Sequence, residues 1–146
     1  MIINRMNRIV SSLFILFFSV VCSAAKIQRL DTLSLEELDE KSSSFIFFIS
    51  QHCSICEKQM EILKKCDFHK KEIKIFLLGT SEEKLRKYAK RLKTPFSIFW
   101  SNSEVEKKFN FNKKTPSSFY MSNGQVITLA EGLINCENIS AYTKNE

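Results

Sequence analysis

Apolar and polar segments alternate along the chain in a way that predicts strands followed by helices. Residues 45–50 and 73–78 are short, continuous apolar runs, which are typical of strands buried on both faces of a sheet. Residues 96–100 form a third strand candidate. A segment with helical spacing follows each of these strands. The three expected helices cover residues 54–66, 81–92 and 103–109.

Shorter signals stand before and after this alternating region. Residues 33–38 carry three leucines beside a candidate capping serine, so we expect a short helical turn before the first strand. Asn123-Gly124 separates two strand patterns, at residues 117–121 and 125–130. Because this dipeptide favours a two-residue turn, the segment predicts a β-hairpin.

A final helix is expected over residues 136–144, after Gly132 closes the hairpin. Together these elements predict an α/β fold with a central mixed sheet, which has a parallel core, a C-terminal β-hairpin and helices on both faces. The chain has no internal repeat and no linker, and its 146 residues suit one domain.

The N-terminal segment has the pattern of a secretory signal. Arg5 and Arg8 precede a nine-residue apolar stretch at 13–21, and small residues follow at 23–25. We therefore expect residues 1–25 to be a signal peptide and residues 26–146 to form the domain, in the periplasm or secreted. The alternative is an uncleaved anchor through residues 9–25, which is at the short end of a membrane-spanning length. A membrane contact is expected only in that case.

The charge pattern argues against nucleic-acid partners. The formal net charge is +6, from 22 basic and 16 acidic residues, and most lysines alternate with acids on the predicted helix faces. No RNA-binding motif and no basic stripe interleaved with aromatic residues occurs. GxGxxG and GxxxxGKS/T strings are also missing, which excludes the common phosphate-binding loops.

Two of the five cysteines have the spacing of a reactive pair. Cys53 and Cys56 lie between the first buried strand and its helix, so both sulfurs are expected at the first helical turn, close enough to bridge. Unpaired amide groups and the positive end of the helix dipole stabilise a thiolate there. We expect Cys53, on the loop side, to be the nucleophile. Cys56, inside the helix, is expected to resolve the mixed disulfide.

Two other interpretations of the pair are less favoured. A zinc site needs about four ligands, usually with a second paired motif. The remaining candidates show no such spacing, so we expect no metal and no cofactor; they are His52, His69, Cys66 and Cys136. A purely structural bridge between Cys53 and Cys56 would close a very small loop and add little stability.

These motifs, in this order, resemble a known family. Residues 45–56 (FIFFISQHCSIC), Thr115-Pro116, Asn123-Gly124 and Gly132 resemble the thioredoxin-like fold. Over about residues 30–140 the chain is most similar to exported TlpA/ResA-type thiol–disulfide oxidoreductases. The resemblance implies that Pro116 is a cis proline that faces the CxxC pair. It also implies that Thr115 and Pro116 help to bind the cysteine-containing segment of a partner.

The chain departs from the family pattern at three places. His52 stands where tryptophan is usual, and Phe47 stands where thioredoxins carry a buried acid. Gln59 and Glu61 replace a Glu-x-Pro string. A His52 imidazolium would stabilise the Cys53 thiolate, and Glu57 is the alternative group for assisting proton transfer at Cys56.

The resemblance implies a thiol–disulfide oxidoreductase that acts as a reductase. The expected partners are exported proteins with disulfides or thiols, and an upstream redox partner that can be membrane-bound. The alternatives are a DsbC- or DsbA-like isomerase or oxidase serving secretion or conjugation machinery, and a non-catalytic binding module of the same fold. The departures at His52 and Phe47 also occur in the DsbC-like pattern.

The other two domain cysteines are not expected to pair. Cys66 lies ten residues beyond Cys56, which is about 15 Å along a helix. In the thioredoxin topology the last helix should begin at the active end, which would place Cys136 far from Cys66. Since bridged Cα atoms lie within about 7 Å, we expect Cys66 to be a buried apolar residue instead. We also expect a domain that does not depend on the Cys53–Cys56 pair for folding.

Overall fold

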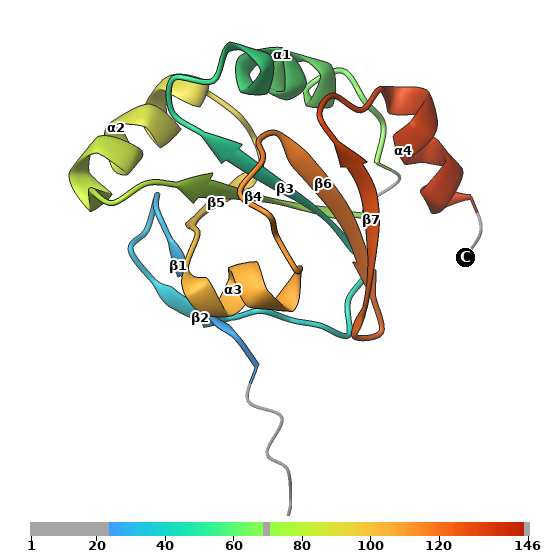
Figure 1. The fold of residues 1–146 in the computed structure, drawn as a ribbon, viewed down its shortest axis with the longest axis horizontal. Helices are drawn as coiled ribbons and strands as arrows, with labels where there is room; N and C mark the ends of the chain where they lie inside the picture. The colour runs from blue at the N-terminus through green and yellow to red at the C-terminus, as the bar shows by residue number, and fades with distance from the viewer. Residues whose placement is uncertain (1–23, 69–70, 145–146) are drawn as a thin grey trace, which may run out of the picture.

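The computed structural model describes residues 24–68 and 71–144. Nearly all of the predicted export segment, residues 1–25, lies outside these ranges. The described residues form seven strands and four helices (Figure 1). In chain order they are β1 (Lys26–Arg29), β2 (Leu35–Glu37), β3 (Ser44–Ser50), α1 (Ser54–Leu63), β4 (Glu72–Leu78), α2 (Glu82–Leu92), β5 (Ser97–Trp100), α3 (Ser103–Lys108), β6 (Ser117–Ser122), β7 (Gln125–Glu131) and α4 (Cys136–Thr143).

The strands form one mixed sheet in the order β2-β1-β5-β4-β3-β6-β7. Strands β3, β4 and β5 are parallel, whereas β6 pairs antiparallel with both β3 and β7. The parallel core and the C-terminal hairpin are therefore confirmed. Strand β3 lies next to the centre of the sheet, which accounts for its continuous apolar run.

Helices cover both faces of the sheet, as predicted (Figure 1). Alternate residues of β3 point to opposite faces, so that Phe45 and Phe47 pack with residues of α1, α2 and α4. Ile46 and Phe48 pack on the other side, in the core cluster that contains Val105 of α3. Helix α1 packs on the first cluster and begins at the predicted reactive pair.

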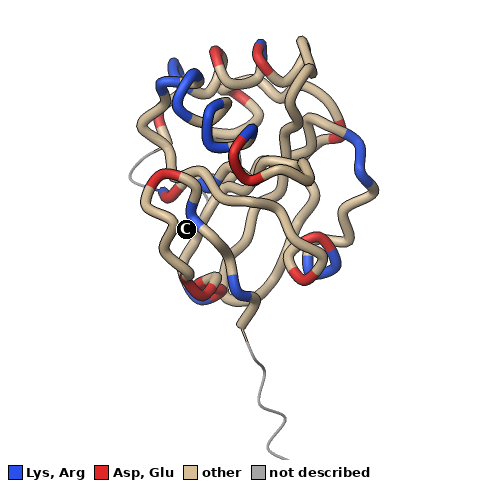
Figure 2. Tube along the Cα trace, turned by 90° about the vertical axis from the view of Figure 1, so that its left-hand side faces the viewer, with Lys and Arg blue, Asp and Glu red and all other residues tan. Residues whose placement is uncertain are grey.

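Local signals explain the ends of the elements. Ser81 caps α2 by accepting a hydrogen bond from the backbone of Lys84, and the helix carries acids first and bases last (Figure 2). Asn123 and Gly124 have φ values of 50° and 77°, which a turn with two left-handed residues requires. Within the described residues, no helix has the length and apolar character needed to cross a membrane.

The helical turn predicted for residues 33–38 is wrong. Leu35–Glu37 form strand β2, which pairs antiparallel with β1, a strand that the sequence pattern did not predict. Leu33 has a φ of 58° and helps to turn the chain between the two strands. Ala25 is buried, and its carbonyl oxygen accepts a hydrogen bond from Leu38, so the contacts of the domain begin one residue before Lys26. Tertiary pairing therefore overrides the local helical spacing.

Candidate functional site

The first buried strand leads directly into the CxxC pair. Strand β3 ends at Ser50, and after a short loop Cys53 is the N-cap residue of α1. A disulfide joins Cys53 to Cys56, with 5.1 Å between their Cα atoms, which confirms the predicted pairing. Cys53 is half-buried, whereas Cys56 is fully buried in the core cluster beneath α1. An incoming group therefore reaches the Cys53 sulfur more easily than the Cys56 sulfur.

The start of α1 provides a hydrogen bond to the outer sulfur. The backbone N–H of Cys56 donates to Sγ of Cys53 at 3.1 Å. An N–H at a helix N-terminus interacts more strongly with a thiolate than with a neutral sulfur, because the helix dipole and the hydrogen bond both favour negative charge. This geometry suits Cys53 as the sulfur that carries the charge in a reduced pair.

The loop before β6 faces the pair, as the family resemblance implied. The Thr115–Pro116 peptide bond is cis. The carbonyl oxygen of Thr115 lies 3.8 Å from Sγ of Cys53, and its hydroxyl group hydrogen-bonds with that of Ser50 at 2.9 Å. The N–H of Gly132 donates to the carbonyl oxygen of Pro116 at 2.7 Å. These contacts hold Thr115 and Pro116 against the CxxC loop.

His52 and Glu57 lie on the exposed side of the site. Both line a groove of about 900 Å³ along α1, together with Tyr88 and Arg91 of α2. His52 has a φ of 60°, so it forms the left-handed turn that leads into Cys53. Glu57 lies in the first turn of α1 and is exposed, whereas Cys56 is fully buried. The two predicted supporting residues are therefore close to the pair in sequence but belong to its rim.

Glu57 acts electrostatically on a tyrosine of the groove. Burial of Tyr88 raises the pKa of its hydroxyl group, and the negative charge of Glu57 raises it further, while Arg91 lowers it. The Arg91 guanidinium lies 5.6 Å from the centre of the Tyr88 ring, which is a cation–π distance. The groove is thus a mixed polar and apolar surface next to the reactive pair.

The buried side of the pair is apolar. Phe47 is fully buried and belongs to the same core cluster as Cys56. The position that would carry a buried acid in thioredoxins is therefore filled by an aromatic ring. Within residues 24–68 and 71–144, no three His, Cys, Asp or Glu side chains gather in a way that could hold a metal ion.

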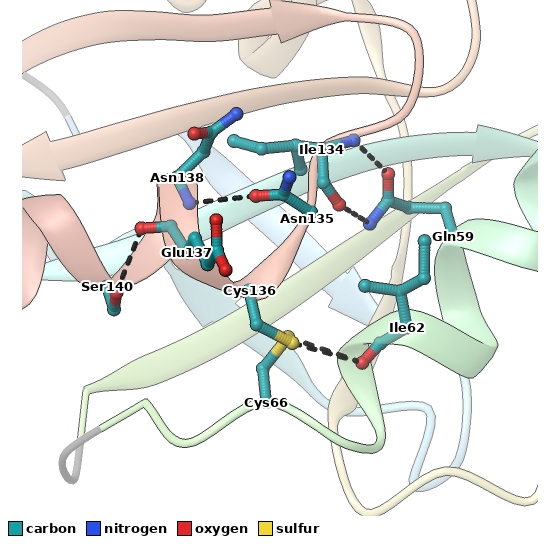
Figure 3. Close-up of a disulfide and its surroundings, with 9 residues drawn as sticks. All are labelled: Gln59, Ile62, Cys66, Ile134, Asn135, Cys136, Glu137, Asn138 and Ser140. Atoms are coloured by element: carbon teal, nitrogen blue, oxygen red, sulfur yellow. Dashed lines mark hydrogen bonds between the residues drawn. A yellow bond between two sulfur atoms is a disulfide. The ribbon is translucent and has the colours of Figure 1, made fainter.

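The expectation that Cys66 and Cys136 do not pair is wrong. They form a second disulfide, with 5.2 Å between their Cα atoms (Figure 3). Two features bring Cys66 and Cys136 closer together than the sequence predicts. Helix α1 ends at Leu63, and the chain turns before Cys66. The segment from Gly132 to Cys136 then runs alongside α1 toward its far end, where Sγ of Cys136 lies 3.8 Å from the carbonyl oxygen of Ile62.

A buried glutamine holds this segment against α1. Gln59 is fully buried, and its side-chain amide donates to the carbonyl oxygen of Ile134 at 3.0 Å and accepts from its N–H at 2.8 Å (Figure 3). The amide therefore satisfies both backbone groups of Ile134. In the sequence, Gln59 stands out only as a departure from a family pattern. A glutamine at a core-facing helical position was the available signal for a buried partner.

Comparison with known proteins supports the fold and gives no close relative. No protein-family model matches the chain, and no curated protein matches it by sequence. Among solved structures it is similar to MTB DsbF in its mixed oxidized and reduced forms, with 11% identity, a TM-score of 0.70, and 83% of this chain and 96% of that chain covered. StoA from Bacillus subtilis shows 17% identity and a TM-score of 0.65, with 82% and 97% covered.

A third similar structure is the exposed lipoprotein thioredoxin Etrx1 from Streptococcus pneumoniae, with 14% identity and a TM-score of 0.68. This similarity covers 84% of this chain and 99% of that chain. The described residues therefore have the thioredoxin-like fold that the sequence motifs implied. Each comparison extends over nearly the whole length of the matched chain, so the fold is present without a large insertion or a missing half.

Proposed function

We propose that this protein is an exported thiol–disulfide oxidoreductase that reduces disulfides in other exported proteins. The observation that supports this proposal most directly is the placement of Cys53. Its sulfur is accessible at the N-cap of α1, lies beside the carbonyl oxygen of Thr115, and is bridged to the buried sulfur of Cys56. A sulfur in these surroundings favours the thiolate form that attacks a disulfide.

The proposed reaction begins with both cysteines reduced. The Cys53 thiolate attacks one sulfur of a partner disulfide, and the other partner sulfur leaves as a thiolate that takes up a proton. Cys56 then loses its proton and attacks Sγ of Cys53, which forms the Cys53–Cys56 bond and releases the second partner thiol. Two electrons pass from the protein to the partner. An upstream dithiol partner must reduce the Cys53–Cys56 disulfide before the next turnover.

The cis-proline loop would bind the partner segment. The carbonyl oxygen of Thr115 lies next to Cys53, and Pro116 has no N–H to offer to a neighbouring strand. An extended peptide can therefore hydrogen-bond to the backbone of Thr115 while its cysteine contacts Cys53, in the manner of strand addition. Ile55, which lies between the two cysteines, and Leu133, which follows Gly132, are exposed apolar side chains that could contact such a peptide.

The direction of electron flow is proposed from the family resemblance, and His52 is the observation that favours the alternative. An imidazolium beside Cys53 would stabilise the reduced form and make the pair more oxidising, as in a DsbA-like oxidase. A reduction potential well below about −200 mV would support the reductase, whereas a value near −120 mV would support the oxidase. Replacing His52 with Ala should lower the potential if its charge acts on Cys53.

A trapping experiment in the native host tests the proposed function. The Cys56→Ser protein should accumulate as mixed disulfides between Cys53 and partner proteins, because the resolving sulfur is missing. The Cys53→Ser protein is the matched control, since it keeps every other cysteine and the same loss of the disulfide. If Cys56→Ser captures no more protein than Cys53→Ser, the proposed mechanism is wrong. The identity of the captured proteins then separates a reductase from a DsbC-like isomerase.

A further inference from the structure

A buried hydroxyl group without a partner lies on the second residue of β6. Ser118 is 1% exposed, and within the described part of the chain its Oγ makes no hydrogen bond. Burying a hydroxyl group without a hydrogen bond is unfavourable, so such groups in folded proteins call for an explanation. The location of Ser118 provides one.

The pairing of β6 with β3 places Ser118 on the α1 face of the sheet. Ser118 is directly opposite Phe47 in the antiparallel ladder, and side chains of such a pair lie on the same face. Phe47 belongs to the core cluster that contains Cys56, and Tyr120, two residues after Ser118, belongs to it as well. The Ser118 side chain therefore points into the core beneath α1.

Ser118 also lies at the end of the sheet that carries the reactive pair. It follows the cis proline by two residues, and β3 runs toward the CxxC loop while β6 runs away from it. The hydrogen bond between Ser50 and Thr115 joins the two strands at this end. Ser118 thus lies on the Cys56 side of the sheet and near the same end, opposite Phe47, which occupies the position of the buried acid of thioredoxins.

The polar side chains that follow Cys56 on α1 are hydrogen-bonded elsewhere or exposed. Both polar atoms of the Gln59 amide bond to Ile134, and Glu57 is exposed. The titratable side chains that pack on the same cluster are tyrosines, from α2, β6 and α4; they are Tyr88, Tyr120 and Tyr142. The hydroxyl groups of Tyr88 and Ser118 both lack a hydrogen-bond partner among the described residues. Tyr88 comes from α2 and lines the groove, whereas Ser118 comes from the sheet, where it is opposite Phe47.

We propose that Ser118 donates a hydrogen bond to the sulfur of Cys56 when the pair is reduced, and that this bond stabilises the attacking thiolate. This inference rests on the proposed function. In the resolving step the Cys56 thiol gives its proton to water, its sulfur bonds to Cys53, and the bond between Cys53 and the partner breaks. Ser118 keeps its own proton throughout. In the disulfide form the Cys56 sulfur is uncharged and a weak acceptor, which accounts for the unpartnered hydroxyl group.

The test follows the resolving step in isolation. The full-length protein, with Cys53 joined to an aromatic chromogenic thiol as a mixed disulfide, releases that thiol when Cys56 attacks. In Ser118→Ala we expect release near neutral pH to slow by about tenfold and its rise with pH to move about one unit higher, since a hydrogen bond to a charged group is lost. Ser118→Thr keeps a hydroxyl group and should restore most of the rate. Attack of reduced Cys53 on a model disulfide should be unchanged.

Ser44→Ala is the matched control. Ser44 is also fully buried in β3 with an unpartnered hydroxyl group, but it is opposite Met121 at the other end of the strand. Its replacement should leave release unchanged at every pH. If Ser118→Ala releases the thiol at the wild-type rate and pH, the role of Ser118 is wrong while the proposed function stands. If the wild-type protein itself fails to release the thiol, both are overturned.

Discussion

The two disulfides of this domain lie at opposite ends of the same helix. Cys53–Cys56 is at the start of α1, and Cys66–Cys136 joins the turn that follows α1 to the start of α4. Their Cα separations are 5.1 and 5.2 Å, so the span across each bridge does not distinguish them. Sequence separation does, because it is 3 residues in one case and 70 in the other.

Under the proposed function, this difference separates the reactive bridge from a structural one. In the loop-entropy model, closing a loop of about 70 residues stabilises the folded state by about 4 kcal/mol, against about 2 kcal/mol for the CxxC loop. The surroundings point the same way. Cys53 lies at a helix N-terminus that favours its thiolate, whereas the Gln59–Ile134 hydrogen bonds reinforce the long-range bridge. Under this proposal, helix α1 has the reactive pair at its start. Its other end is held by the Cys66–Cys136 disulfide and the Gln59–Ile134 hydrogen bonds, and we call it the fastened end.

The largest expected effect is on catalysis at the start of the helix. Cys53→Ser should reduce exchange with a model disulfide to the uncatalysed rate, because the attacking sulfur is gone. Its free energy of unfolding should fall by no more than about 2 kcal/mol, since only the small loop is opened. Turnover of an insulin-like disulfide substrate and urea denaturation measure the two effects. A Cys53→Ser protein that still exchanges would remove the distinction between the bridges.

The largest expected effect on stability is at the other end. Replacing Cys66 and Cys136 together with Ala should lower the free energy of unfolding by about 4 kcal/mol, because the long loop is no longer closed. Disulfide exchange at 25 °C should persist as long as the variant stays folded. The matched control replaces Cys53 and Cys56 with Ala and should show the reverse pattern. A larger loss of stability in that control would contradict the assignment.

Sequence patterns predict the reactive end of α1 well, because its signals are local. The apolar run of β3, the CxxC spacing and the hairpin dipeptide each act within a few residues, and Pro116 is recognised from the hairpin that follows it. The sequence alone also shows that Phe47 stands where thioredoxins carry a buried acid. The layers of helices then follow from the alternation of strands and helices.

The disulfide at the fastened end is not predicted from the sequence, because the residues that bring its two cysteines together are distant from one another along the chain. The Cys66–Cys136 pairing depends on the end of α1 at Leu63 and on the path of residues 132–135 beside α1, and neither is visible in periodicity. Gln59 binds a backbone 75 residues away. The prediction of a helical turn at residues 33–38 is wrong for a related reason, since the pairing of β2 with β1 outweighs the helical spacing of the leucines.

Removing the glutamine contact should weaken the fastened end without opening its disulfide. Gln59→Ala leaves the N–H and the carbonyl oxygen of Ile134 buried without partners, so we expect a loss of about 2–3 kcal/mol in the free energy of unfolding. The exposed neighbour Lys58→Ala is the control and should change it by less than about 0.5 kcal/mol. Urea denaturation of the oxidised proteins measures both. Equal effects would mean that the hydrogen bonds to Ile134 contribute no net stability.

The smallest expected effect concerns the charges on the rim of the reactive end. Burial and then the charge of Glu57 raise the pKa of Tyr88, so this residue binds its proton more tightly in the folded state. Its stabilising contribution is complete below the ordinary tyrosine pKa of about 10 and is lost as the pH rises through the folded-state value. Glu57→Gln should lower the Tyr88 pKa and reduce that alkaline loss by less than about 0.5 kcal/mol.

Arg91→Ala should shift the Tyr88 pKa in the opposite direction, because Arg91 lowers it. Tyrosinate absorbance during an alkaline titration measures both shifts, and equal signs would contradict the electrostatic account. The same Glu57→Gln protein tests whether this carboxylate also assists proton transfer at Cys56. Because Glu57 is exposed and Cys56 is buried, we expect the resolving step to keep its rate and its pH dependence. A slower step would mean that the Glu57 carboxylate takes part in removing the Cys56 proton, and the transfer of that proton directly to water would then be wrong.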